Sequence, residues 1–454
     1  MKRKSMRAAA ACGLALGAMG ALYGSAALAQ QTGEGKTTVA VVAKYAFEIY
    51  GHLDLSFDDA NKGIDGHVAP PPTGPAVGRL GWQPDVSSNL SYLGLRGDHP
   101  LGEGDLKAVW QIETQVDVAA TAGVSSDNSV KGALGSRNTY VGIAGGFGAI
   151  KIGKTDAPYK LSTARMDPFS ATVGDYNSIM GNTGGDNRAE FDTRVSHAVW
   201  YESPKMGEFS FSALFSPGQN RSSDNTGLAS GEPQCTGGNA GPGCNDGAFD
   251  NLFSVAGAYQ SGPLYAIAAY EVHKNVNRTG DEDGVIVPAG AVGIVDEKAY
   301  KVGAQYKVGS STVVNAIWER MVRNAPNANF NERDRSGYWL ALTQKVAAAD
   351  DLNLGWAHAG KTPGEPATNR GDGTTAGGPV DDASNMATVG YKHHFADHAT
   401  TWYLVYARQM NHTGAHYDLG ASGHGITTDC HDAAGNCYAG ATVQAASIGM
   451  THDF

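Results

Sequence analysis

Several stretches of this chain alternate strictly between apolar and polar residues. In residues 47–57 the odd positions carry apolar side chains or glycine, and the even positions are mainly polar. The same two-residue period returns in residues 106–113, 209–216 and 300–307. Because successive side chains of a β-strand point to opposite faces, each stretch predicts a strand with one apolar face and one wet face.

The spacing of such stretches predicts sixteen strands along the chain. Each boundary is placed to within a few residues. The expected strands cover 47–58, 88–98, 104–117, 136–145, 147–156, 194–203, 207–216, 249–260, 263–274, 296–308, 311–323, 336–347, 350–361, 384–395, 399–411 and 441–454.

The links between the expected strands alternate in length. Those after even-numbered strands are tight turns, such as Gly145-Gly146 and Ser261-Gly262. Those after odd-numbered strands are long and contain clusters of Gly, Pro, Asn and Asp, the residues of irregular exposed chain. Short periplasmic turns and long outer loops are typical of outer-membrane barrels. The long links cover 59–87, 118–135, 157–193, 217–248, 275–295, 324–335, 362–383 and 412–440.

A soluble exported β-sandwich or adhesin would also alternate, with its apolar face packed inward. Two features favour a membrane barrel instead. The last expected strand reaches Phe454, so it is placed to pair with the first strand and leave no edge in lipid. Aromatic residues near strand ends suit interfacial girdles. These are Phe47, Tyr201, Tyr270, Trp318, Trp339, Trp356, Phe395 and Trp402. We therefore predict an all-β, 16-stranded antiparallel transmembrane β-barrel.

The first 29 residues have the three parts of a secretory signal peptide. Basic residues occupy positions 2–7, an apolar stretch follows, and Ala27 and Ala29 supply the small residues that a signal peptidase reads. A transmembrane anchor is the alternative, but the apolar run is short and rich in Ala and Gly. We expect cleavage after Ala29 and a single barrel domain over residues 30–454.

Charge and motifs exclude several classes of function. Removal of residues 1–29 takes away four basic residues and no acidic residue, which lowers the formal net charge from −11 to −15. An acidic exported chain is poorly suited to nucleic acid, whose affinity rests on Lys and Arg neutralising phosphates. The run 145–148 (GGFG) lacks the Lys-Ser/Thr of a phosphate loop, and no Gly-x-Ser-x-Gly elbow is present. We expect neither an enzyme, such as a barrel lipase or protease, nor a cofactor.

Four cysteines follow the expected cleavage site, in two close pairs. In an oxidising compartment we expect them to form the disulfides Cys235–Cys244 and Cys430–Cys437. A metal site formed by the second pair with His431 is the alternative, but no second CxxC accompanies it.

Histidines gather in the last long link, among them His412 and His416. A helix would place these two rings on one face, as in some metal sites, but Gly414 and Gly420 give little support to a helix. Solvated surface histidines are the expectation, a divalent-metal site remains the alternative, and no metal is assigned.

Eight segments, in order and spread over residues 50–454, resemble the Gram-negative general diffusion porins, especially those of the betaproteobacterial type. The segments are YGHLD (50–54), SYLGLRG (91–97), LKAVWQIE (106–113), RNTYVGI (137–143), GGFGAIKIGK (145–154), DPF (167–169), YESP (201–204) and SIGMTHDF (447–454). The resemblance implies a trimeric barrel whose third extracellular loop folds inward. It leaves the role of residues 30–46 unassigned, and the loops 217–248 and 412–440 are large for the family.

In the family that this chain resembles, the inward loop narrows the pore, and here that loop is 157–193. Acidic residues on one side and basic residues on the other would set a transverse field that favours polar solutes and tunes ion preference. Ordinary solvated loop charges and wall ion pairs are the simpler interpretation. The residues predicted to line the constriction are Arg96, Lys107, Glu113, Arg137, Lys151, Asp167, Asp175, Asp186, Glu190, Asp192 and Arg194.

These features together predict an outer-membrane porin for passive diffusion of ions and small hydrophilic solutes. A substrate-selective channel for a sugar, dicarboxylate or oxyanion is the alternative. An aromatic ladder on the lumen face would favour a sugar channel, but only isolated candidates, Tyr50 and Tyr92, are visible in the sequence. The expected partners are small solutes, outer-membrane lipid, lipopolysaccharide and two further copies of the chain. Ion preference and the physiological solute are left open.

Overall fold

The computed structural model describes residues 38–42, 45–64, 81–119, 134–181, 191–217, 249–277, 294–326, 331, 334–363, 381–419 and 438–454. The predicted signal peptide and residues 30–37 lie outside this part of the chain. Eighteen strands form one antiparallel sheet. The first nine are β1 (Thr38–Val42), β2 (Tyr45–Asn61), β3 (Gln83–Ser88), β4 (Tyr92–Pro100), β5 (Lys107–Gln115), β6 (Thr139–Gly145), β7 (Gly148–Asp156), β8 (Arg194–Glu202) and β9 (Phe209–Ser216). The others are β10 (Asn251–Ser261), β11 (Leu264–Asn277), β12 (Ile294–Val308), β13 (Thr312–Arg323), β14 (Ser336–Ala347), β15 (Asp350–Ala359), β16 (Ser384–His394), β17 (Thr400–Asn411) and β18 (Thr442–Asp453).

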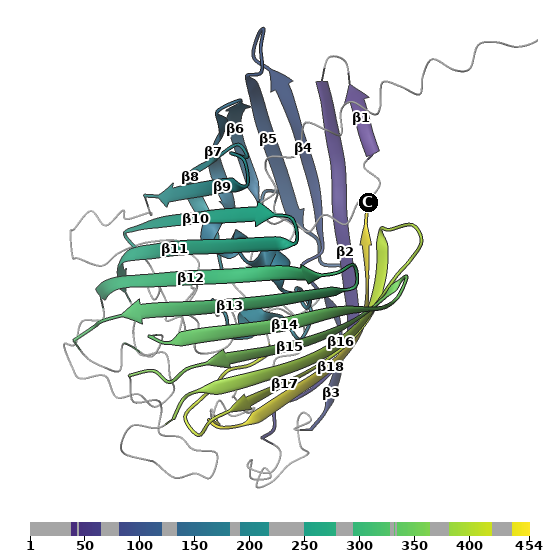
Figure 1. Ribbon diagram of the computed structural model, residues 1–454, viewed down its shortest axis with the longest axis vertical. Coiled ribbons are helices and arrows are strands. Elements are labelled where there is room, and N and C mark those ends of the chain that lie inside the picture. Colours follow the sequence, from purple (N-terminus) through teal and green to yellow (C-terminus); the bar gives the residue numbers. More distant parts are fainter. Residues whose placement is uncertain are drawn as a thin grey trace, which may run out of the picture.

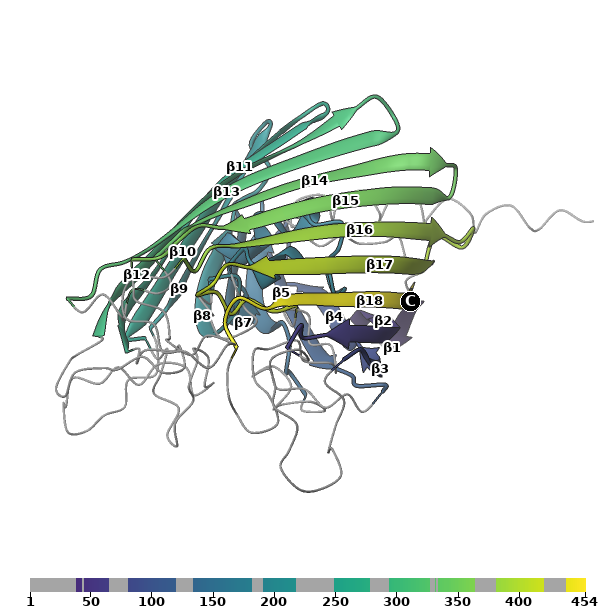
Figure 2. The same ribbon diagram turned by 90° about the horizontal axis from the view of Figure 1, so that it is seen from below.

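The sheet closes on itself because the last strand, β18, pairs with β2 (Figures 1 and 2). Every other neighbour pair from β4 to β18 is consecutive in the chain. β3 and β4 lie one after the other along the same edge of β2, and β1 pairs only with the beginning of β2. The wall is therefore a closed barrel of sixteen antiparallel strands, and the predicted fold class is confirmed.

One predicted strand is interrupted. The expected strand 88–98 is divided by residues 89–91, where Leu90 has a φ of 56°. The break turns the Asn89 side chain into the interior, where its Nδ2 atom donates to Ser56 Oγ at 2.8 Å and to the Tyr403 hydroxyl at 3.1 Å. An interior hydrogen-bond network thus accompanies the left-handed backbone, and no periodic pattern in the sequence marks it.

The two faces of the wall differ as the alternation predicts. Outward side chains such as Leu340 and Ile448 are about half exposed in the isolated chain, at 50% and 51%. Inward polar residues such as Lys301 and Glu319 are fully buried. An apolar outer band and a polar interior are the pattern of barrels that cross lipid. Within the described residues no helix is long and apolar enough to cross a bilayer.

One residue of the predicted girdle was assigned to the wrong face. Trp318 and Trp356 point outward, with 37% and 38% of their surface exposed. Trp339, by contrast, is fully buried on the inner face, where it packs against the loop that follows β7. Its neighbour Leu340 takes the outward position, because faces alternate along a strand.

Candidate pore constriction

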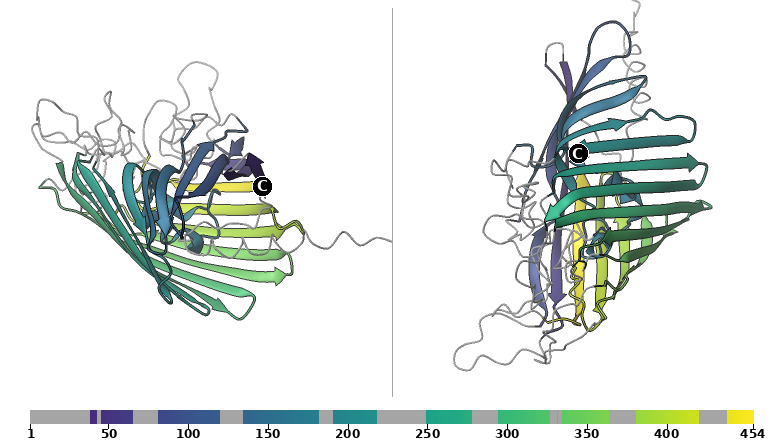
Figure 3. Two further views of the ribbon diagram at one scale, coloured as in Figure 1. Left: turned by 90° about the horizontal axis from the view of Figure 1, so that it is seen from above. Right: turned by 90° about the vertical axis from the view of Figure 1, so that its left-hand side faces the viewer.

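The connection between β7 and β8 enters the barrel, as predicted for the third long loop. It contains the helix α1 (Pro158–Leu161) and two 3₁₀ turns, Ala164–Met166 and Tyr176–Ser178. The helical turns lie behind β10–β14, on the inner side of the wall (Figures 1 and 3). Buried apolar side chains hold them there by leaving water together with the wall. These are Met166, Phe169, Val173, Tyr176, Ile179 and Met180.

Side chains of the wall satisfy the backbone of this inward loop. Trp339 Nε1 donates to the Met166 carbonyl at 3.1 Å, and the Tyr265 hydroxyl donates to the Ser162 carbonyl at 3.0 Å. A buried carbonyl without such a partner would cost free energy comparable to a lost hydrogen bond. The wall therefore fixes the path of the loop as well as its depth.

Two strand glycines make room for the loop. An added Cβ atom at Gly355 would lie 2.8 Å from the Phe169 ring, and one at Gly390 would lie 2.9 Å from it. The Phe169 ring in turn meets Trp339 edge-on, with 6.2 Å between ring centroids. The loop reaches the inner wall of β15 and β16 because no side chains stand at these two positions.

A buried ion cluster joins the two ends of the loop to the same pair of strands. Lys301 on β12 places its Nζ atom 2.6 Å from Asp192 and 3.9 Å from Glu319 on β13. The Tyr159 hydroxyl donates to Glu319 at 2.8 Å. All three charged side chains are fully buried, and removing one partner of such a pair typically costs about 3–5 kcal/mol.

The structure places the predicted acidic residues of the loop inside its fold. Asp167 accepts from the backbone N–H groups of Phe169 and Tyr176, and Asp175 accepts from Asn177 N at the start of a 3₁₀ turn. Burial, followed by the nearby Asp175 carboxylate, raises the pKa of Asp167 well above its usual value.

Asp192 belongs to the ion cluster with Lys301 and is buried as well. Asp167, Asp175 and Asp192 are each at most 5% exposed, so they present little charge to a water-filled lumen. Asp186 and Glu190 lie in 182–190, outside the described residues.

All five predicted basic residues lie on the opposite wall, β4–β8 and the link before β6, and each has a carboxylate partner. The Arg96–Glu48 pair has two contacts, at 2.6 and 2.7 Å. Glu113, one of the residues predicted to line the constriction, is the buried partner of Arg137, at 2.6 Å. The remaining pairs are Lys107–Asp98 at 3.2 Å, Lys151–Glu202 at 2.8 Å and Arg194–Asp156 at 3.3 Å.

Aromatic rings back three of these cations. The Arg96 guanidinium lies 4.7 Å from the Tyr50 ring centroid, Arg137 lies 4.7 Å from that of Tyr92, and the two rings are 6.1 Å apart. Lys151 lies 4.6 Å from the Tyr140 ring. Each cation thus contacts a carboxylate and a ring at once, and cation–π contacts are worth about 0.5–1 kcal/mol at exposed sites and about 2 kcal/mol or more where they are desolvated.

The sequence analysis did not assign several side chains to the site. Lys301, Glu319, Arg335 and Trp339 hold the loop, and Tyr140 backs Lys151. Alternation could assign the strand residues among them to a face, but it carries no information about which inward residues meet the loop. Closure of the barrel decides which inward residues contact the loop.

The other predicted sites are only partly covered by the structure. The four cysteines of the expected disulfides Cys235–Cys244 and Cys430–Cys437 lie outside the described residues. His412 is described and pairs with Asp381 at 2.9 Å. His416 is 2% exposed, so the expectation of a solvated surface histidine is wrong at that position. In the described ranges, no group of three or more His, Cys, Asp or Glu could hold a metal ion.

Comparisons with known proteins agree on one family. A family model described as Gram-negative porin matches residues 9–414. The major outer membrane protein P.IA of Neisseria meningitidis is 32% identical over 164 residues, which is 36% of this chain. That match spans 37% of the relative's own length.

Solved structures show the same fold over the whole barrel. The anion-selective porin from Comamonas acidovorans matches with a TM-score of 0.63 and 18% identity, over 90% of this chain and all of that one. The trimer form of OmpT, an outer membrane protein of Vibrio cholerae, matches with a TM-score of 0.52 and 15% identity, over 90% of this chain and 99% of that one.

Proposed function

Because this chain belongs to the Gram-negative porin family, we propose that it forms a water-filled channel through which ions and small hydrophilic solutes diffuse passively. The family places it in the outer membrane. The observation that carries the proposal is the packing of residues 157–181, the described first part of the inward loop, against the inner wall of a closed barrel with a polar interior. A sixteen-stranded barrel is wide enough for an aqueous passage, and such a loop narrows it without any covalent chemistry.

The charges that face this passage are proposed to belong mainly to the β4–β8 wall. Arg96 and Lys107 are 37% and 38% exposed, whereas the described acidic residues of the loop are buried. Each wall cation has a carboxylate within 3.3 Å, which cancels most of its field at a distance. We therefore expect weak ion preference from this wall, and discrimination mainly by size.

The selective-channel alternative is less well supported by the described rings. A sugar channel needs free aromatic faces along the lumen, whereas Tyr50, Tyr92 and Tyr140 each have a wall cation over the ring. A channel current that saturated as the concentration of one class of solute rose would favour the selective channel.

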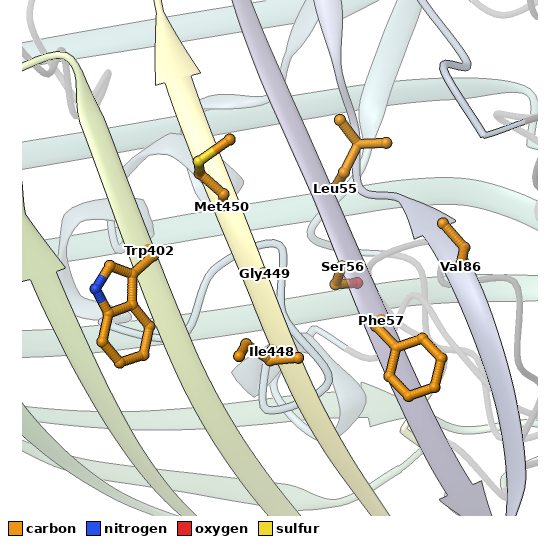
Figure 4. A pocket seen from close by; sticks show the side chains of 8 residues that line it. All are labelled: Leu55, Ser56, Phe57, Val86, Trp402, Ile448, Gly449 and Met450. Carbon is orange, nitrogen blue, oxygen red and sulfur yellow. The ribbon is translucent and has the colours of Figure 1, made fainter.

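Assembly into a homotrimer is proposed through the outer face where the two ends of the barrel meet. There Trp402, Ile448, Met450, Leu55, Phe57 and Val86 line a shallow apolar hollow across β17, β18, β2 and β3 (Figure 4). Contact between copies through this face would cover one side of each barrel with protein instead of lipid. The trimer form of the Vibrio cholerae neighbour supports a trimer for this fold, and the apolar hollow is our basis for placing the contact at this face.

The deciding experiment is single-channel recording of the refolded protein in a planar bilayer, with the reversal potential measured under a salt gradient. We expect discrete conductance steps in groups of three and a reversal potential near zero. Folded and inserted protein that never conducts would contradict the porin proposal. A large reversal potential would contradict the weak ion preference proposed for the β4–β8 wall, but it would not contradict the channel proposal.

A further inference from the structure

The beginning of the last long loop also lies on the inner side of the barrel. Residues 414–419 are all buried, and Ala415, Tyr417 and Leu419 belong to the same apolar cluster as the inward loop. Strand β17 ends at Asn411, whose side-chain Nδ2 donates to the Tyr417 carbonyl at 2.8 Å. The segment therefore turns back over the end of its own strand instead of leaving the barrel.

Backbone hydrogen bonds at Gly414 and Ala415 fix the first half of this segment. Gly414 N donates to the Asp381 carbonyl ahead of β16, at 2.9 Å. Gly440 N, ahead of β18, donates to the Ala415 carbonyl at 3.0 Å. The segment 412–419 is thus tied to three neighbouring strands at the end of the barrel that carries the long loops.

Arg335 connects this segment to the inward loop. Its guanidinium Nη2 donates to the Ile179 carbonyl of the inward loop at 2.6 Å, and its carbon lies 5.4 Å from the Tyr417 ring centroid. Nη1 lies 4.0 Å from Glu319 of the buried ion cluster. The side chain is 1% exposed, so a full charge lies buried between the two segments, where its planar guanidinium reaches both of them and the ion cluster.

We propose that residues 412–419 form a second constriction element, linked through Arg335 to residues 157–181 of the inward loop, so that the two segments together bound the passage. The proposal rests on the channel function proposed above. Arg335 acts as a positioning residue: it binds no solute but holds Ile179 and Tyr417 in place. Loss of the guanidinium loosens both segments, because it makes both contacts, whereas loss of the Tyr417 ring loosens residues 412–419.

The test compares single-channel conductance and the size limit for neutral polyethylene glycols between wild type and the variants Arg335→Ala and Tyr417→Ala. We expect each variant to raise conductance about twofold, to admit larger polymers and to add open-channel noise. The double variant should do no more than Arg335→Ala alone, because residues that act through one contact are not additive. Arg335→Lys keeps the charge but loses the fork, and it should resemble Arg335→Ala.

Arg320→Ala is the matched control. Arg320 lies on the adjacent strand β13, pairs with Asp334 and is 34% exposed, and its neighbours Ile317 and Glu319 are the ones that face inward. We expect it to conduct as wild type does. Heat-dependent gel migration and circular dichroism verify folding, and should Arg335→Ala not fold, Tyr417→Ala and Arg335→Lys carry the test.

If wild type does not conduct, the proposed function is wrong. If wild type conducts and the folded Arg335 and Tyr417 variants keep its conductance, size limit and noise, the second constriction is wrong.

Discussion

At Arg96 the guanidinium contacts a carboxylate and a ring at the same time, and Arg137 and Lys151 repeat the arrangement. Such a cation has little freedom to move, since its carboxylate fixes one side and the ring another. The position of each charge along the wall is therefore set by three side chains from neighbouring strands. The ion selectivity contributed by each cation therefore depends on whether its paired carboxylate is charged.

Glu48→Gln should make the channel more permeable to anions, because it leaves the charge of the partly exposed Arg96 uncompensated. We expect the anion-to-cation permeability ratio, obtained from reversal potentials, to rise by about twofold at low salt. Glu48→Asp keeps the charge and serves as the control. An unchanged reversal potential in Glu48→Gln would show that this wall does not set ion preference.

Asp192 should give the fold a pH dependence. Burial, opposed by Lys301 and reinforced by Glu319, raises the pKa of Asp192 from 3.8 to about 7. Between these two values the folded protein binds a proton that the unfolded chain does not, so this group adds stability as pH falls through 7 and loses it as pH rises. Lys160 is the other charged group near Asp192.

We expect the free energy of unfolding in urea to gain on the order of 1–2 kcal/mol from Asp192 between pH 8 and pH 5.5. Asp192→Asn should lack this gain. Equal pH dependence of unfolding in the two proteins would rule out Asp192 as the titrating group.

At the scale of elements, the inward loop and the strands it touches form one packing unit. Strand glycines Gly355 and Gly390 accommodate Phe169, and Trp339 supplies both a ring contact and a hydrogen bond. A loop buried in this way packs directly on side chains and glycines of several strands. A bulky side chain introduced beneath it should therefore displace it toward the passage.

Gly390→Leu should push Phe169 and its loop away from β16 into the passage, since the new side chain would occupy the space of the ring. We expect single-channel conductance to fall by about half. Gly257→Leu is the matched control, because a Cβ atom at Gly257 meets nothing within 4 Å. Equal conductance in the two variants would mean that Phe169 does not set the width of the pore.

At the scale of the whole molecule, β18 and β2 close the barrel and place Phe57, Ile448 and Met450 side by side on the outer face. Registers on both sides of this seam are continuous from β15 to β3. The closure thus creates an apolar surface from opposite ends of the chain, and this surface is where we propose that copies meet.

Met450→Lys should disrupt the trimer, whereas Leu340→Lys should not. Both residues point outward and are similarly exposed, 52% and 50%, so each lysine carries a comparable cost of about 2–4 kcal/mol if it faces lipid. Cross-linking and the migration of unheated samples on gels report the assembly. Trimers in both variants would place the subunit contact elsewhere on the barrel.

Local patterns in the amino-acid sequence identify most of the strands and their order, but not the break at residues 89–91 or the inward position of Trp339. Two-residue periodicity is local, so residues 47–57 or 300–307 identify a strand without reference to the rest of the chain. The alternating short and long links then leave a closed antiparallel barrel as the simplest arrangement, and the identity of the inward loop followed from family resemblance. Even the basic residues of the wall could be placed on the inner face by counting.

Tertiary structure alone decided which charges meet. Glu113 could equally have faced the acidic loop, and its pairing with Arg137 depends on the register of β5 against the segment before β6. In the sequence, Asp192 is indistinguishable from a solvated loop charge. In the structure it is buried and bonded to Lys301, which lies more than a hundred positions away in the chain. Pairing and burial are properties of contacts between distant segments. Only closure of the barrel brings those segments together, so no local pattern can encode them.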